Sequence, residues 1–249
     1  MSYRRSYSTV SFGVGPVPPA VKWLLISNIA IFLIGFFAMA MGLGDVLAIF
    51  GLSPSMVWGY GAVWQFVTYL FIHSPYSMFH ILFNMLTLWM FGSDLERDWG
   101  TRYFLKYYFV CGIGAGFLDF LARTIYGPMD VRTIGASGAI YGLLLAFGML
   151  YPNRTILFMF LFPIKAKYFV MIIGAIAFLS SFQTGSGISH LAHLGGMLFG
   201  FGFLQVRRRR MSLMDYLVQE YQAYKLRRAK RKFQVYMRKR AGEDARWVN

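Results

Sequence analysis

Residues 135–151 read GASGAIYGLLLAFGMLY, an apolar run whose third residue is Ser137. A second run, residues 189–206, contains AHLGG at residues 192–196 and so carries His193. Each run is near the length of a helix that crosses a bilayer. A polar residue inside such a helix costs free energy and usually marks function. These two stretches predict a membrane fold with a serine and a histidine at membrane depth.

The composition agrees with a membrane protein. Of the 249 residues, 57% are hydrophobic and only 14% are charged, whereas a soluble domain carries about 25% charged residues. Apolar runs occur at about 23–41, 75–91, 103–122, 135–151, 168–182 and 189–206. Each is near the roughly 17–25 residues that a spanning helix needs. We therefore predict an all-α, polytopic protein with six transmembrane helices.

Two further apolar segments are interrupted. Glycine and proline break residues 45–70, and Pro163 breaks residues 156–164. We interpret both as interfacial or re-entrant pieces. The run at 23–41 could also be a cleaved signal peptide. Its apolar core exceeds the roughly 7–15 residues of such peptides, which favours an uncleaved span. The single cysteine, Cys111, excludes an intrachain disulfide.

The charge distribution predicts the orientation of the chain. The net charge is +15, and 14 of the 25 Lys and Arg follow residue 206. Arg4, Arg5 and Lys22 precede the first run. Because positive residues near span ends mark the cytoplasmic side, both termini are predicted to be cytoplasmic, which requires an even number of spans. The three loops then assigned to the outside carry only Arg123 and Arg132.

This reading divides the chain into three parts. Residues 1–22 form a cytoplasmic N-terminal segment, residues 23–206 the membrane domain, and residues 207–249 a basic cytoplasmic tail. Residues 211–240 have helical character. We favour a solvated helix that anchors the topology, and the alternative is contact with anionic lipid headgroups. Nucleic-acid binding is not expected, because no recognition motif accompanies the charge.

The predicted topology brings the rare polar groups to one depth. HILFN at residues 80–84 places His80 and Asn84 four residues apart, on one face of the second helix. Ser137 and His193 begin the fourth and sixth helices. Because even-numbered helices start outside, all four residues lie in the outer half of the membrane.

Glycines give these helices a reason to meet. Gly135, Gly138 and Gly142 accompany Ser137, and Gly196 and Gly200 share a helix face with His193. Small residues at such spacing let helix backbones approach closely in lipid. A histidine that reaches the serine hydroxyl can remove its proton, which activates serine as a nucleophile for acyl transfer.

The remaining polar residues suggest supporting roles. Candidate donors to a tetrahedral oxyanion are the Asn84 amide, a His80 N–H and the backbone N–H of Ser137. Tyr141, four residues after the serine, could stack on the imidazole. No acidic third member is evident, because Asp119 precedes Arg123 by four residues and is better explained by an interfacial ion pair. A Ser-His dyad is expected.

These three stretches together resemble the motifs of rhomboid intramembrane serine proteases. GASG at residues 135–138 resembles the GxSG motif, and residues 192–200 resemble the AHxxGxxxG motif. Residues 80–84 resemble the HxxxN motif that lines the family's oxyanion hole. The resemblance covers about residues 58–205, with the motifs in the family's order.

The resemblance implies a function and its residues. Ser137 would be the nucleophile and His193 the general base. Asn84, His80 and Gly135 would support the oxyanion, and Tyr141 would pack beside the histidine. The family needs no cofactor or metal and cleaves single-span membrane proteins in or near their transmembrane segments. The expected location is a bacterial inner membrane, with the active site open to the non-cytoplasmic side.

Two features depart from the family's pattern or complicate it. Residues 42–74 would form the family's partly embedded first loop, where many members carry Trp-Arg. This chain has Trp64-Gln65 instead, which puts an anchoring arginine contact in doubt. His190 lies three residues before His193 and could face the same way, but its position in the motif favours His193 as the base.

Three other functions would account for part of the pattern. A metal-dependent intramembrane protease could use His73, His80, His190 and His193, but no HExxH is present and no acid lies nearby. A non-catalytic rhomboid-like protein could bind or escort membrane clients, although such relatives typically lack the serine or the histidine. A transporter would be expected to show repeat symmetry, and none is visible.

Overall fold

The computed structural model describes residues 15–158, 162–181 and 190–206, and beyond them residues 218, 220–222, 224–226 and 228. The chain forms two compact units, Met1–Phe203 and Leu204–Asn249. The described residues between 218 and 228 are helical. The predicted helix over residues 211–240 lies mostly outside the described residues, and the predicted three-part division stays a prediction.

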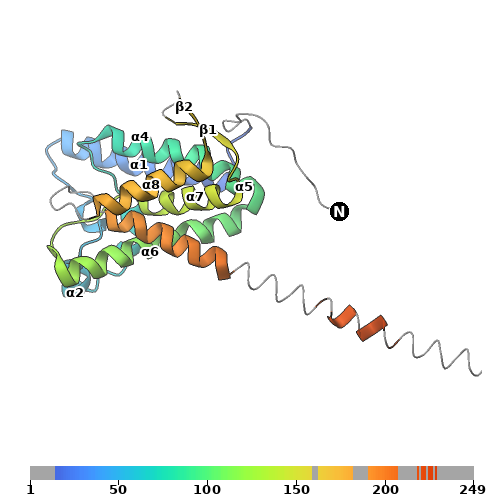
Figure 1. Ribbon diagram of the computed structural model, residues 1–249. Coiled ribbons are helices and arrows are strands. Elements are labelled where there is room, and N and C mark those ends of the chain that lie inside the picture. The colour runs from blue at the N-terminus through green and yellow to red at the C-terminus, as the bar shows by residue number, and fades with distance from the viewer. Residues whose placement is uncertain are drawn as a thin grey trace, which may run out of the picture. The chain divides into compact units, whose positions relative to one another are not determined.

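The first unit is mostly helical (Figure 1). Its longer helices are α1 (Pro19–Ala40), α4 (Met78–Thr87), α6 (Thr101–Tyr126), α7 (Ser137–Leu150), α8 (Ala166–Ser180) and a helix over residues 190–206, here called the 190–206 helix. A helix therefore lies on each of the predicted apolar runs. By length and hydropathy, α1 and α6 could each cross a bilayer, whereas α7 and α8 are shorter apolar helices. The count of six spans stays a prediction.

The second predicted run continues further than expected. After α4 the chain passes through a π-helical turn, η3 (Leu88–Gly92), into α5 (Ser93–Trp99). Asp94 and Glu96, the acidic residues that follow the apolar run, lie within α5 and are paired with other groups of the protein. Glu96 is buried, and its carboxylate accepts hydrogen bonds from the backbone N–H of Ala20 at 2.9 Å and of Val21 at 2.8 Å. It thereby satisfies N–H groups that the first turn of α1 would otherwise leave unpaired.

One segment corrects the all-α prediction. Strands β1 (Thr155–Phe158) and β2 (Phe162–Lys165) form an antiparallel hairpin within the predicted interfacial piece 156–164. β-Branched and aromatic residues favour strands, and Pro163 removes a helical donor. A short apolar segment of this kind cannot be assigned to helix or strand by periodicity alone.

The first loop is built from short helical turns and fixed by buried polar groups. It contains η1 (Ala48–Phe50), α2 (Pro54–Tyr60), α3 (Gln65–Thr68) and η2 (Tyr69–Phe71). Gln65, which stands where many family members carry arginine, is fully buried. It accepts a hydrogen bond from the N–H of Ser53 at 3.0 Å and donates one to the carbonyl of Ile49 at 2.9 Å. The amide therefore anchors the loop from within.

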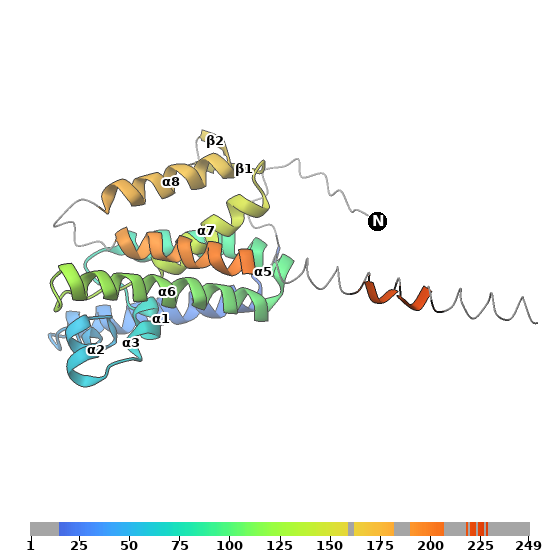
Figure 2. The same cartoon turned by 60° about the horizontal axis from the view of Figure 1, so that its bottom comes forward.

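The helices run alongside one another, with α6 and α7 in the middle. Figure 2 shows α8 on one side of these two and α2 and α3 on the opposite side. Glycines permit the closest contacts. A Cβ built on Gly196 would lie 1.8 Å from the carbonyl oxygen of Gly138, and one on Gly195 would lie 3.0 Å from the Cα of Ala115 in α6. The 190–206 helix thus meets α7 and α6 backbone to backbone.

We expect Gly196→Ala to destabilise the protein strongly. The added methyl group would overlap the Gly138 carbonyl, and overpacking of this kind costs about 3 kcal/mol. The free energy of unfolding can be measured by SDS titration in mixed micelles. Gly202→Ala is the matched control, because a Cβ there meets nothing within 4 Å. Equal stability of the two variants would contradict the contact.

We expect Glu96→Gln to lower stability by about 1–3 kcal/mol, because an uncharged amide cannot accept from both N–H groups of α1. Thermal unfolding in detergent would measure the change. Glu220→Gln changes the same chemistry at an exposed position and should leave the midpoint unmoved. A midpoint for Glu96→Gln equal to that of Glu220→Gln would show that the carboxylate does not hold α1.

Candidate active site

A pocket of about 730 Å³ brings together the residues predicted to form the dyad and its oxyanion and ring support. The six predicted residues that line it are Ser137, His193, Asn84, His80, Tyr141 and Gly135. They come from α4, from α7 and the turn before it, and from the 190–206 helix. Residues far apart in the chain are therefore brought to one site.

Ser137 and His193 are in hydrogen-bond contact. The Nε2 atom of His193 lies 2.8 Å from the Oγ atom of Ser137. Ser137 is the first residue of α7, and His193 lies in the first turn of the 190–206 helix. Gly138 directly follows Ser137 and Gly196 lies three residues after His193, so their contact fixes the spacing of the two helices beside the pair. A neutral imidazole at this distance can accept the serine proton.

The Tyr141 ring stacks on one face of the His193 imidazole. The two rings are stacked, with centroids 4.1 Å apart and planes 4° from parallel. The other nitrogen of His193, Nδ1, is buried and finds no hydrogen-bond partner among the residues that the structure describes. The ring is thus oriented by stacking and by its contact with the serine, without a carboxylate.

His190 lies beside His193 without replacing it. Their ring centroids are 5.9 Å apart, in an edge-to-face arrangement. His193 makes the contact with Ser137, and His190 is not among the residues that line the pocket. The geometry thus separates two histidines that the sequence left as competing bases.

Gly135 and His80 pack against each other at the start of α7. Gly135 has a φ of +111°, a conformation that favours glycine. A Cβ there would lie 2.8 Å from Nε2 of His80. The Gly135 N–H donates to the carbonyl of Tyr69 at 2.9 Å. Glycine is therefore required both by the backbone angle and by the imidazole ring that covers it.

Asn84 is buried with its amide directed partly along its own helix. Its Nδ2 atom donates to the carbonyl of His80 at 2.8 Å. An amide nitrogen carries two hydrogens, so one remains for another acceptor. Backbone N–H groups in the first turn of α7, beginning with Ser137, have no acceptor within the helix. Donors of both kinds border the pocket.

Asp119 makes the ion pair expected from its spacing. Nε of Arg123 lies 2.9 Å from its Oδ2 atom. Thr133, which lines the pocket, also donates to this carboxylate. Asp119 itself is not among the residues that line the pocket, which leaves it structural.

Sequence reasoning missed several residues around the pocket. The Tyr69 hydroxyl donates to the carbonyl of Gly112 at 2.6 Å, which ties the first loop to α6. Phe169 and Ile173 of α8 also line the pocket. An apolar residue in an apolar helix gives no sequence signal of this role. Within the part of the chain that the structure describes, no group of three or more His, Cys, Asp or Glu is arranged to hold a metal ion.

Comparison with known proteins identifies the family. The Rhomboid domain family matches residues 60–210. The rhomboid protein YdcA of Bacillus subtilis (strain 168) is 35% identical over 156 residues, which are 60% of this chain and 70% of YdcA. Rhomboid protease GluP of the same organism is 32% identical over 177 residues, 70% of this chain and 32% of GluP.

A mitochondrial relative has a similar sequence identity to this chain. Rhomboid protein 1 of Saccharomyces cerevisiae is 30% identical over 182 residues, 64% of this chain and 49% of that protein. This chain thus spans about a third of GluP and half of the yeast protein. The matched region contains all three motifs and the helices that carry them. The chain belongs to the rhomboid family and is an integral membrane protein of mostly helical structure.

Proposed function

We propose that this protein is an intramembrane serine protease in which Ser137 and His193 act as a dyad. The observation that carries the proposal is the 2.8 Å contact between His193 Nε2 and Ser137 Oγ inside the pocket. Two further facts support it. The pocket lies in the domain that matches the rhomboid family, and one relative, GluP, is named a rhomboid protease.

The arrangement supports a two-step acyl transfer. The Oγ atom of Ser137 attacks the scissile carbonyl as His193 takes the hydroxyl proton on Nε2. The tetrahedral intermediate collapses, and the histidine returns that proton to the leaving amine. Water then attacks the acyl-enzyme with the same proton transfers, which releases the carboxylate product and restores the serine.

The oxyanion has three sources of stabilisation. The backbone N–H of Ser137 lies at the positive end of the α7 dipole, where negative charge is favoured. The second amide hydrogen of Asn84 is the next donor, and His80, whose Nε2 atom lies close to Gly135, can supply an N–H. Donors placed before the reaction begins need no reorganisation as charge develops.

The apolar helices and the distribution of charge support a membrane setting for the site. We propose that α1, the continuous α4–α5 segment, α6, α7, α8 and the 190–206 helix cross the membrane, with both termini in the cytoplasm. The pocket would then open to the non-cytoplasmic side of a bacterial inner membrane. Its substrates would be single-span membrane proteins. Phe79 and Phe83 of α4 face the pocket as do residues of α8, which suits an apolar segment approaching from lipid.

We expect purified protein in liposomes to cleave a model single-span substrate. Ser137→Ala and His193→Ala should each lower kcat by at least about 10³-fold, because neither residue has a substitute. Product formation on gels with fluorescent substrate gives the rates. Ser181→Ala is the control. It removes a hydroxyl at the end of α8 that donates to the carbonyl of Phe178, outside the pocket lining, and it should retain full activity. Undiminished cleavage by Ser137→Ala would refute the proposal. Binding without cleavage by the unsubstituted protein would favour a client-binding role.

We expect His190→Ala to keep most activity, in contrast to His193→Ala, because His193 alone of the two contacts the serine. Asn84→Ala should reduce kcat by roughly 10²-fold while KM changes little, since it removes one oxyanion donor and leaves others. Steady-state kinetics on the same substrate would measure both. A loss in His190→Ala equal to that in His193→Ala would overturn the assignment of the base.

A further inference from the structure

Apolar side chains of the β1–β2 hairpin are exposed at the start of β2. Phe162 is 63% exposed, and the neighbouring Pro163 is also exposed. Residues 155–165 read TILFMFLFPIK and contain no Asp or Glu. Of the described hairpin side chains, Ile156 is the buried one. Neighbouring exposed apolar side chains such as Phe162 and Pro163 suit contact with a partner or a membrane.

The hairpin can leave water without breaking its own backbone bonds. Its strands pair in antiparallel register, with Ile156 opposite Ile164 and Leu157 opposite Pro163. Paired strands satisfy much of their N–H and C=O groups internally. Pro163 in β2 has no backbone N–H, so this position leaves no donor unpaired. The groups on the two outer edges still need water or headgroups, so the hairpin suits the interfacial layer and not the hydrocarbon core.

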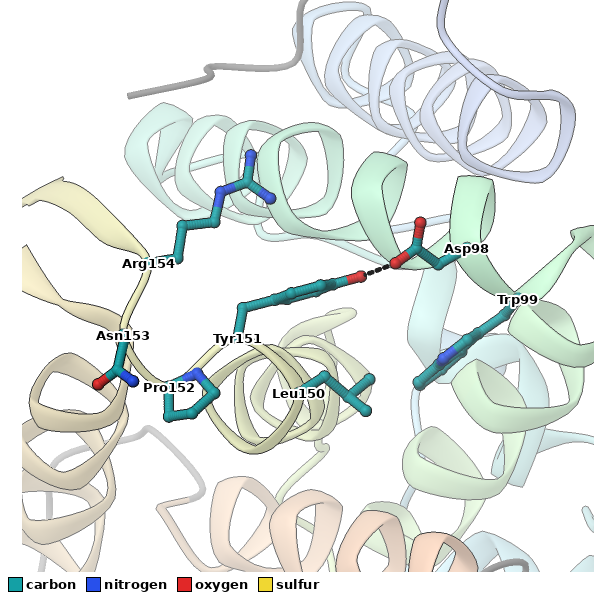
Figure 3. A pocket seen from close by; sticks show the side chains of 7 residues that line it. All are labelled: Asp98, Trp99, Leu150, Tyr151, Pro152, Asn153 and Arg154. Atoms are coloured by element: carbon teal, nitrogen blue, oxygen red, sulfur yellow. Dashed lines mark hydrogen bonds between the residues drawn. The ribbon is translucent and has the colours of Figure 1, made fainter. Parts of the chain in front are cut away.

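The root of the hairpin is fixed to the helix bundle. Figure 3 shows a pocket of about 540 Å³ between the end of α5 and residues 150–154, with the Tyr151 hydroxyl bonded to Asp98. Arg154 forms an ion pair with Asp94 at 2.8 Å. The N–H of Ala166 donates to the carbonyl of Arg154 at 2.8 Å. These contacts set the direction in which the hairpin leaves the bundle.

That direction is sideways. In Figures 1 and 2 the hairpin lies at the end of the bundle where α7 ends and α8 begins, and it projects across the helix axes. This end is opposite to Ser137, which begins α7, and a helix of this length places the two about 20 Å apart. A segment that leaves two membrane helices at their shared end and turns sideways follows the membrane surface.

Cations sit at the base of the hairpin. Lys165, the last residue of β2, is exposed. Lys167 follows it in the first turn of α8, with its Nζ atom 4.9 Å from the centroid of the Tyr168 ring. Lysines beside an apolar segment at a membrane surface attract anionic headgroups, and aromatic residues prefer the same level.

We propose that the β1–β2 hairpin inserts the exposed side chains of Phe162 and Pro163 into the interfacial layer of the adjacent leaflet, with Lys165 and Lys167 contacting anionic phospholipid headgroups. The partner is the bilayer itself. Four features point to the bilayer: the exposed apolar side chains, the backbone pairing within the hairpin, its sideways direction and the lysines at its base. A soluble protein partner would require neither the sideways direction nor the lysines. The proposal rests on the membrane crossing of α7 and α8 proposed above, but not on the Ser137–His193 chemistry.

A nitroxide spin label at Phe162→Cys tests the insertion. The native Cys111 is fully buried, so the unsubstituted chain gives the labelling background. In liposomes, the ratio of collisions with oxygen to collisions with a water-soluble nickel chelate should be several-fold higher at residue 162 than at a label on Asn153→Cys, an exposed polar position at the root. Equal ratios at the two positions would place the hairpin in water and overturn the proposal in favour of a soluble partner.

The charge contribution is tested with two vesicle compositions. Adding phosphatidylglycerol to phosphatidylcholine vesicles should raise the ratio at residue 162, and the Lys165→Gln/Lys167→Gln pair should abolish that rise. Arg154→Gln is unsuitable as a control because Arg154 holds the root. Arg132→Gln serves instead, since it lies in the loop before α7, at the opposite end of that helix. A ratio that does not respond to phosphatidylglycerol would refute the headgroup contact.

Discussion

The close approach of α7 and the 190–206 helix is the constraint on which the site depends. The space between Gly138 and Gly196 is smaller than a methyl group requires, and Ser137 and His193 lie next to it. Two side chains on separate helices can keep a 2.8 Å contact only if the backbones cannot drift. Tyr107 of α6 reinforces this region by donating to the carbonyl of Gly142 at 2.8 Å.

A second theme is how an apolar fold accommodates buried polar groups. Glu96, Gln65 and Asp119 are each almost fully buried. Each joins segments whose relative positions hydrophobic packing alone would not fix, because lipid offers little preference between one apolar face and another. Glu96 connects α5 to α1, Gln65 closes the first loop, and Asp119 ties α6 to the segment before α7. Hydrogen bonds of this kind are directional, so they specify position where packing does not.

The sequence predicted the helical runs well because each one repeats a single physical property, sustained hydrophobicity. It also selected the residues that line one pocket, because serine, histidine and asparagine are rare in such runs. The hairpin was not predicted, since Ile156 to Phe162 is apolar in any conformation. The extension to Trp99 was missed because the partners of Glu96 lie far away in the chain. Phe169 and Ile173 of α8 carried no signal, because their role depends on what α8 faces.

The unshared Nδ1 atom of His193 bears on how fast such a site can work. In proteases with a triad, a carboxylate stabilises the imidazolium that forms after proton transfer. Here the described surroundings of His193 are the stacked Tyr141 ring, Ser137 and a second histidine. In the proposed mechanism a charged imidazole would therefore find little compensation, and the hydroxyl would be activated only weakly. A weakly activated serine would leave folded helices that diffuse past uncut and would act on chains that stay longer in the pocket. Selectivity would then come from residence time as much as from recognition.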